Sequence, residues 1–295
     1  MYDMEQYYQA TSVADAIAAL GADPAAMPIA GGTDVLIQTR EGRHAGCHLV
    51  SLHGLSELSA IRAEEDGTLV IGSGCTFSEI TNAPLLRPHI NMLCQAVDQV
   101  GSPQIRNMGT IGGNVCNGVT SADSAPSLMA LNAVLEVQGP SGKRLIPIGE
   151  WYAGPGKTVR QHDEVLTAVR IARENYEGFG GHYIKYGKRE AMEISTLGCA
   201  VQVKLSADKR AVEDLRIAFG VAAPTPVRCP KTEAMALGRT VDEALVRELG
   251  QSVLTEINPR DSWRASKSFR LQIAKEICRR AFRQAVAFAG GEIHA

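Results

Sequence analysis

The pattern of hydrophobic and polar residues changes near residue 175. Before that point, short apolar runs bounded by glycine, proline and asparagine alternate with helical patterns, which predicts a mixture of helices and strands. After a polar, glycine-rich segment at residues 173–181, three largely alternating runs predict an antiparallel sheet, at residues 182–186, 198–205 and 212–221. The pattern is helical from residue 232 onward. The sequence therefore predicts an α+β protein of two domains, residues 1–176 and residues 177–295.

Individual elements follow from the same pattern. In the first domain, helices are expected over residues 13–20, 77–81, 93–100 and 125–131. Strands are expected over residues 28–30, 48–52, 68–72, 133–137, 143–148 and 164–171. Residues 35–38 fit either a strand or the start of a helix, and Thr11 or Ser12 is expected to cap the first helix.

In the second domain, helices are expected over residues 241–253 and 266–288. The last one carries lysine and arginine on one face and these apolar residues on the other: Phe269, Ile273, Ile277, Ala281 and Val286. It is therefore expected to cover the sheet with its apolar face.

Residues 101–125 combine glycine, apolar residues and small polar side chains. The glycines are Gly101, Gly109, Gly112, Gly113 and Gly118. Apolar residues between them are spaced as core residues would be, so the stretch is not a flexible linker. Glycine lets the backbone approach a ligand closely, and consecutive N–H groups can form a concave anion site. We expect a loop that wraps a large polar ligand; the alternative is a set of tight turns.

A second glycine turn lies upstream, at residues 29–37. Each Gly-Gly pair has a threonine beside it, Thr33 in one and Thr110 in the other, so the two turns could hold one diphosphate from both sides. The familiar nucleotide motifs are missing from the sequence. There is no G-x-G-x-x-G, and Trp151 stands where a P-loop ending at Gly156-Lys157-Thr158 would need glycine.

The amino-acid composition excludes some classes of function. The 295 residues carry a net charge of −2, 45% of them are hydrophobic and 21% are charged, as in an ordinary water-soluble protein. This balance argues against a nucleic-acid partner, and no apolar run is long enough to span a membrane. The seven cysteines are scattered, with no clustered spacing for a metal or an iron–sulfur centre. With no signal peptide at the amino terminus, we expect a cytoplasmic protein.

Two motifs together resemble a known family. The first motif is Ala30-Gly31-Gly32-Thr33-Asp34, and the second consists of Gln104-Ile105-Arg106-Asn107 and Thr110-Ile111-Gly112-Gly113-Asn114. This pair is similar to motifs of the flavin-carrying medium subunit of molybdenum hydroxylases. More specifically, it resembles the FAD-binding subunit of bacterial xanthine dehydrogenases. The similarity extends along nearly the whole chain. It implies a two-part FAD-binding domain of the vanillyl-alcohol-oxidase type, followed by a carboxy-terminal antiparallel sheet with helices that closes over the flavin.

The resemblance also implies which residues contact FAD. These are Pro28, Ile29, Ala30, Gly31, Gly32, Thr33, Asp34, Val35, Leu36, Val100, Thr110, Ile111, Gly112, Gly113, Asn114, Asp123, Leu166, Lys185 and Ile194. Some relatives have an aromatic residue in place of Val100. Without the resemblance, Asp123 fits a helix cap equally well, whereas Leu166 is expected in the core and Lys185 is expected to be a solvated charge on a strand.

The family implies an electron-transfer function. A molybdenum-cofactor subunit oxidises the organic substrate, a [2Fe–2S] subunit relays electrons to this FAD, and NAD is the expected acceptor; no side chain of this chain acts as acid, base or nucleophile. The loop at residues 188–195 is expected beside the flavin. Alternatives are the flavin subunit of a carbon monoxide, nicotinate or aldehyde dehydrogenase, a free-standing FAD oxidase, or a non-catalytic nucleotide-binding regulator.

Overall fold

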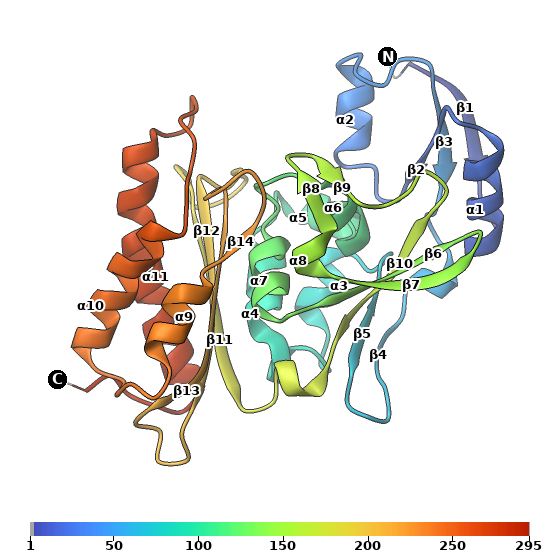
Figure 1. The fold of residues 1–295 in the computed structure, drawn as a ribbon. Helices are drawn as coiled ribbons and strands as arrows, with labels where there is room; N and C mark the ends of the chain where they lie inside the picture. The colour runs from blue at the N-terminus through green and yellow to red at the C-terminus, as the bar shows by residue number, and fades with distance from the viewer. Residues whose placement is uncertain (1–2, 295) are drawn as a thin grey trace.

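Three larger sheets, a two-stranded ribbon and the helices packed on them make up the molecule, which a computed structural model describes over residues 3–294 (Figure 1). The first sheet is parallel, with strand order β1 (Met4–Gln9), β3 (Cys47–Ser51), β2 (Ala26–Ile29). Helix α1 (Val13–Ala22) begins at Ser12, whose side chain accepts the Asp15 N–H, so Ser12 rather than Thr11 is the cap. Residues 35–40 form helix α2 (Val35–Arg40), which decides between the two expectations for that segment.

The second sheet is antiparallel. Its order is β4 (Ile61–Ala63), β5 (Leu69–Gly72), β10 (Val165–Ile171), β6 (Val134–Gly139) and β7 (Gly142–Pro147). β4 and β5 form one hairpin, and β6 and β7 form another. The β4–β5 turn contains Gly67 at φ +85°, and the Asp66 carboxylate accepts the Thr68 N–H at 2.8 Å.

Helices fill the space between the second sheet and the carboxy-terminal sheet (Figure 1). They are α3 (Phe77–Asn82), α4 (Arg87–Asp98), α5 (Pro103–Met108), α6 (Ile111–Asn117) and α7 (Ser124–Ala130). The short α8 (Ile148–Trp151) and the ribbon of β8 (Tyr152–Gly154) and β9 (Lys157–Thr158) lie beside them. The expected loop at residues 101–125 is thus wrong in its local structure, because α5 and α6 occupy much of it.

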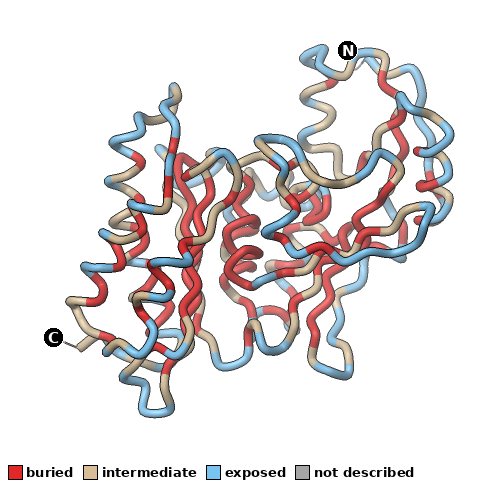
Figure 2. Tube along the Cα trace, viewed as in Figure 1, coloured by how far each residue is buried: buried red, intermediate tan, exposed pale blue. Residues whose placement is uncertain are grey.

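The carboxy-terminal sheet has strand order β11 (Phe179–Tyr186), β12 (Leu197–Leu205), β13 (Val212–Gly220) and β14 (Val227–Arg228), all antiparallel as predicted. Helices α9 (Pro230–Ala236), α10 (Glu243–Ser252) and α11 (Lys267–Phe288) cover its outer face, whereas α4 and α7 pack on the other. Burial on both faces explains why eight of the nine residues of β12 are buried (Figure 2).

The core is continuous between the two parts of the chain. One cluster of buried residues joins Leu93 and Leu128 of the first part to Tyr183 and Ala200 of the second. The division at residues 176 and 177 therefore stays a prediction.

The expected apolar face of α11 is partly wrong. Phe269 is 43% exposed, whereas Arg270 is 1% exposed. The buried guanidinium donates to the Thr196 carbonyl at 3.1 Å, the Ala265 carbonyl at 3.1 Å and the Ser262 hydroxyl at 2.8 Å. Arg270 points inward because its guanidinium donates hydrogen bonds to polar groups of two loops, one that precedes β12 and one that precedes α11.

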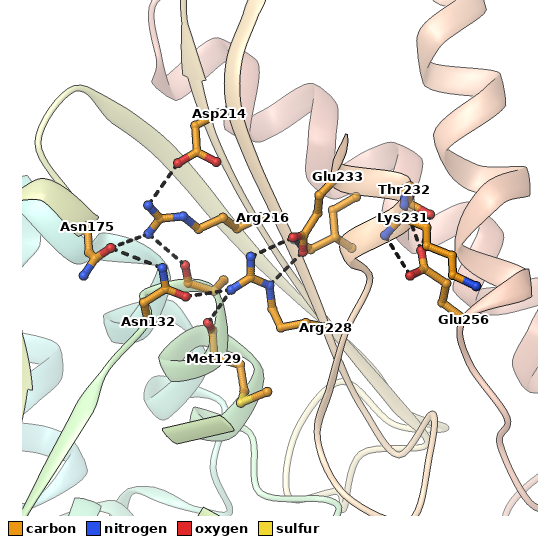
Figure 3. Close-up of polar contacts among 12 residues, drawn as sticks. Met129, Asn132, Asn175, Asp214, Arg216, Arg228, Lys231, Thr232, Glu233 and Glu256 are labelled. Atoms are coloured by element: carbon orange, nitrogen blue, oxygen red, sulfur yellow. Dashed lines mark hydrogen bonds and ion pairs between the residues drawn. The ribbon is translucent and has the colours of Figure 1, made fainter. Parts of the chain in front are cut away.

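A polar network also joins the two parts (Figure 3). Arg228 forms two bonds with the Glu233 carboxylate, at 2.7 and 2.8 Å. The same guanidinium donates to the Met129 carbonyl at 3.0 Å and to the Asn132 side chain at 2.8 Å, at the end of α7. One arginine therefore holds β14 and α9 against the first part of the chain.

We predict that Arg228→Met lowers the free energy of unfolding by about 3 kcal/mol, because it leaves the Glu233 carboxylate, 12% exposed, without its partner. The matched control is Arg280→Met, whose pair with Glu276 is exposed and should contribute about 0.5 kcal/mol or less. Urea denaturation compares the two variants. Equal losses would show that the network does not hold the parts together.

Candidate functional site

The two glycine-bearing stretches meet in the structure, as the sequence predicted. A Cβ atom at Gly31 would lie 1.7 Å from the Met108 carbonyl oxygen, so only glycine permits this backbone contact. A second link joins the stretches beyond it, because the Asn117 side-chain amide donates to the Asp34 carboxylate at 2.9 Å. The structure thus brings residues 30–36 against the segment that contains α5 and α6.

The turn after β2 presents unpaired backbone donors. In the described part of the chain, the N–H groups of residues 31–35 donate no hydrogen bond to any protein acceptor. Gly32 has φ +68°, which turns the chain between β2 and α2, and Gly31, Gly32 and Thr33 are only half-buried. A run of accessible N–H groups on a glycine turn is a suitable cradle for an anion, so this turn fits a diphosphate.

The second Gly-Gly pair has a different structural role. Thr110 caps α6, and its hydroxyl accepts the Gly113 N–H at 3.1 Å. The N–H groups of Ile111, Gly112 and Asn114 donate to the carbonyls of Cys75, Ser73 and Thr110 at 3.0, 2.8 and 3.0 Å, respectively. The expectation of a loop at residues 110–114 is therefore wrong, because α6 begins at Ile111 and the N–H groups of residues 111–114 already donate to Thr110, Ser73 and Cys75.

A buried carboxylate lies at the junction of the two parts. Asp123 is 5% exposed and accepts from the Tyr183 hydroxyl at 2.8 Å, from the Lys185 ammonium at 2.8 Å and from the Ser195 hydroxyl. Lys185 also donates to the Gln99 carbonyl at 2.8 Å. Burial raises the pKa of the Asp123 carboxyl, while the Lys185 ammonium and the two hydroxyls act to lower it. Burial and the nearby carboxylate raise the pKa of Tyr183 well above its ordinary value, so the phenol remains a donor.

These contacts decide between the readings of two residues. Asp123 precedes α7, but its side chain makes no capping hydrogen bond, so the helix-cap alternative is wrong. The Lys185 side chain is 8% exposed and paired, which excludes a solvated surface charge. Leu166 is 3% exposed and lies within the main core, as expected for a core residue.

The remaining candidates are spread more widely. Ile29 and Ile111 are buried, Val100 packs against the main core, and Ile194 is 51% exposed on the loop before β12. Sequence analysis did not name Tyr183, and it included Ser195 only as the last residue of the loop at residues 188–195 that is expected beside the flavin. Tyr183 could have been found, since alternate residues of a strand share a face and it lies two positions before Lys185. Ser195 carried no such signal.

A cavity of about 340 Å³ adjoins the buried pair. Its walls are Gln99, Lys185 and residues 186–193. Lys185, which pairs with Asp123, therefore also lines this cavity.

Comparison with known proteins places this geometry in a family. Residues 2–173 match the model of the FAD binding domain in molybdopterin dehydrogenase, and residues 182–285 match that of the CO dehydrogenase flavoprotein C-terminal domain. The chain belongs to this family of flavoproteins. Its predicted fold class and FAD as its cofactor are thereby confirmed.

Individual relatives agree over the whole length. The chain is 43% identical to the putative xanthine dehydrogenase FAD-binding subunit XdhB of Escherichia coli K12, over 99% of this chain and 100% of the relative. It is 28% identical to the carbon monoxide dehydrogenase medium chain of Hydrogenophaga pseudoflava, over 96% and 97%. The solved carbon monoxide dehydrogenase of Hydrogenophaga pseudoflava superposes with a TM-score of 0.91 at 28% identity, over 97% of this chain and 99% of that one.

Two features were also sought within residues 3–294. No helix there is long and apolar enough to cross a membrane. No group of three or more histidine, cysteine, aspartate or glutamate side chains is placed there to hold a metal ion.

Gly31→Ala is expected to remove most of the bound flavin, because the added Cβ would collide with the Met108 backbone and push the two stretches apart. The control is Gly149→Ala, whose Cβ would meet nothing within 4 Å. Flavin absorbance per chain after gel filtration measures retention, with circular dichroism to monitor folding. Full flavin occupancy in Gly31→Ala would refute the requirement for this contact.

Lys185→Met is expected to lower the free energy of unfolding by roughly 3–5 kcal/mol, because it leaves the Asp123 carboxylate buried and unpaired. The double variant Lys185→Met/Asp123→Asn removes that charge and should recover much of the loss. Lys231→Met, at an exposed lysine of α9, is the control and should stay within about 0.5 kcal/mol of the wild type. Asp123→Asn alone completes the cycle, and additive effects of the two single changes would contradict the pairing.

Proposed function

We propose that the chain is the FAD-carrying electron-transfer subunit of a molybdenum hydroxylase of the xanthine dehydrogenase type. One observation carries the choice of branch: identity to the Escherichia coli xanthine dehydrogenase FAD-binding subunit is 43% along the full length, against 28% for the carbon monoxide dehydrogenase medium chain. In this proposal a molybdenum-cofactor subunit and a [2Fe–2S] subunit are the partners, and NAD is the final acceptor.

Bound FAD supplies the chemistry, because it can exchange electrons singly with an iron–sulfur centre and in pairs with a nicotinamide. The residues of this chain bind and position it. The N–H groups of residues 31–35 and the Thr33 hydroxyl hold the diphosphate. The second stretch contributes the Asn114 side chain and the close backbone surface at Gly113.

The Asp123–Lys185 pair sets the charge near the flavin. Asp123 and Gln99 fix the Lys185 ammonium, so bound FAD would meet a cationic donor whose position is already set. Tyr183 and Ser195 hold the carboxylate that positions Lys185. No side chain of the chain has to transfer a proton.

The cysteines suit a reducing compartment. All seven are free thiols, and all but Cys116 are buried. We therefore place the assembly in the cytoplasm.

The test is to purify the protein with its native neighbours and to record its visible spectrum under anaerobic conditions before and after adding NADH. The proposal predicts flavin and iron–sulfur absorbance, a larger and a smaller co-purifying chain, and bleaching by NADH and by xanthine. Bleaching by carbon monoxide, nicotinate or an aldehyde in place of xanthine would move the chain to another branch of the family. A lone flavoprotein that turns over a small donor with oxygen would instead be an oxidase.

A further inference from the structure

The His48 imidazole lies between two carboxylates. Its Nδ1 atom is 2.5 Å from Asp23 Oδ2, in the connection between α1 and β2, and its Nε2 atom is 3.4 Å from Glu5 Oε2 on β1. A neutral imidazole carries one N–H group, so one of its nitrogens would face a carboxylate with a lone pair, whereas an imidazolium donates to both. The geometry therefore fits the protonated form of His48.

The electrostatics act in the same direction. The hydrogen bond with Asp23, together with the weaker contributions of Glu5, raises the pKa of His48 above its ordinary value, although partial burial opposes the shift. The same hydrogen bond is the main cause of the lowered pKa of Asp23. Within residues 3–294, neither carboxylate forms an ion pair with a lysine or an arginine, so protonated His48 supplies the positive charge with which both can pair.

A second histidine reaches the same connection from the loop between β9 and β10. The His162 Nε2 atom lies 2.9 Å from the Leu20 carbonyl oxygen and 3.0 Å from the Asp23 carbonyl oxygen. Carbonyls only accept hydrogen bonds, so this nitrogen is a donor, and it satisfies carbonyls at the end of α1 that have no partner within the helix. Residues 20–23 therefore join the first sheet to the loop that leads into the second sheet.

This connection lies at the start of β2, and the glycine turn lies at its end. Ala26, the first residue of β2, is opposite His48 in the register of the sheet, and its N–H donates to the Asp23 carbonyl at 3.0 Å. Because β2 is an edge strand that pairs with β3 alone, contacts at its two ends contribute to its position. At the far end the Gly31 backbone contacts the Met108 carbonyl. The strand that carries the glycine turn is thus held by His48 at one end and by this backbone contact at the other.

We propose that His48 is a pH-sensitive clamp on FAD binding: as an imidazolium it ties β1, β3 and the α1–β2 connection together and keeps the glycine turn in the position that binds the cofactor. This inference goes beyond the proposed function and does not depend on it, because it concerns only the cofactor. The raised pKa of His48 fixes the sign. The paired imidazolium is fully present below the ordinary histidine pKa of about 6.5 and is lost as pH rises through the higher pKa of the folded protein, so FAD affinity falls with rising pH.

The experiment titrates FAD into the assembled protein after removal of its flavin, between about pH 6 and about pH 9, and follows flavin fluorescence. The dissociation constant of the wild type should rise about fivefold across this range, at the low end of the usual coupling between two sites. His48→Gln can donate a hydrogen bond but does not titrate, so it should show the weaker constant at every pH. Asp23→Asn should move the midpoint of the transition to lower pH, because it removes the main cause of the raised pKa of His48.

The matched control is His53→Gln, at an exposed histidine of the same part of the chain, which should keep the wild-type profile. Circular dichroism and gel filtration at each pH check folding and assembly; should His48→Gln not fold, the midpoint of Asp23→Asn decides. A profile of His48→Gln parallel to that of the wild type would assign the titration to another group and overturn the inference. A constant that does not change with pH in the wild type, or a midpoint that Asp23→Asn leaves unmoved, would also overturn it. Failure of xanthine or NADH to bleach the flavin, with this profile intact, would overturn the proposed function alone.

Discussion

The backbone contact between Gly31 and the Met108 carbonyl oxygen sets the geometry on which the site depends. With a Cβ atom only 1.7 Å from that oxygen, no other residue could bring the turn after β2 so close to the end of α5. Within residues 3–294, the N–H groups of residues 31–35 donate no hydrogen bond to a protein acceptor, whereas those of residues 111–114 donate to Thr110, Ser73 and Cys75. One stretch therefore supplies the free donors, and the other supplies the rigid surface against which they are held.

A second constraint comes from electrostatics. A carboxylate that is only 5% exposed requires hydrogen-bond donors. Asp123 accepts hydrogen bonds from Tyr183, Lys185 and Ser195, which belong to the second part of the chain. The ion pair thereby fixes β11 and the loop before β12 against α7, with the cavity next to Lys185. The same contacts that join the two parts thus fix the position of the Lys185 ammonium. Arg228 adds a further contact between the two parts, and Arg270 links two loops within the second part.

Much of this could be predicted from the sequence, for physical reasons that differ between elements. The antiparallel carboxy-terminal sheet and the hairpin at Gly67 follow from alternation and turn chemistry, which are local properties. The contact between Asp123 and Ser195 could not be predicted, since the two residues are 72 positions apart and nothing local indicates it. The inward Arg270 and the helical form of residues 103–117 were also missed. In both cases, distant polar groups or a capping threonine outweighed the local hydrophobic and glycine pattern.

Hydrogen exchange of the assembled protein with and without FAD tests the central claim most directly, because it reports on the backbone donors themselves. The account predicts that a peptide spanning residues 31–35 exchanges quickly without FAD and becomes protected when FAD binds. A peptide spanning residues 111–114 should be protected in both states, because its N–H groups are already paired. Protection gained only at residues 111–114, with residues 31–35 unchanged, would contradict the assignment of the free donors to the first glycine turn.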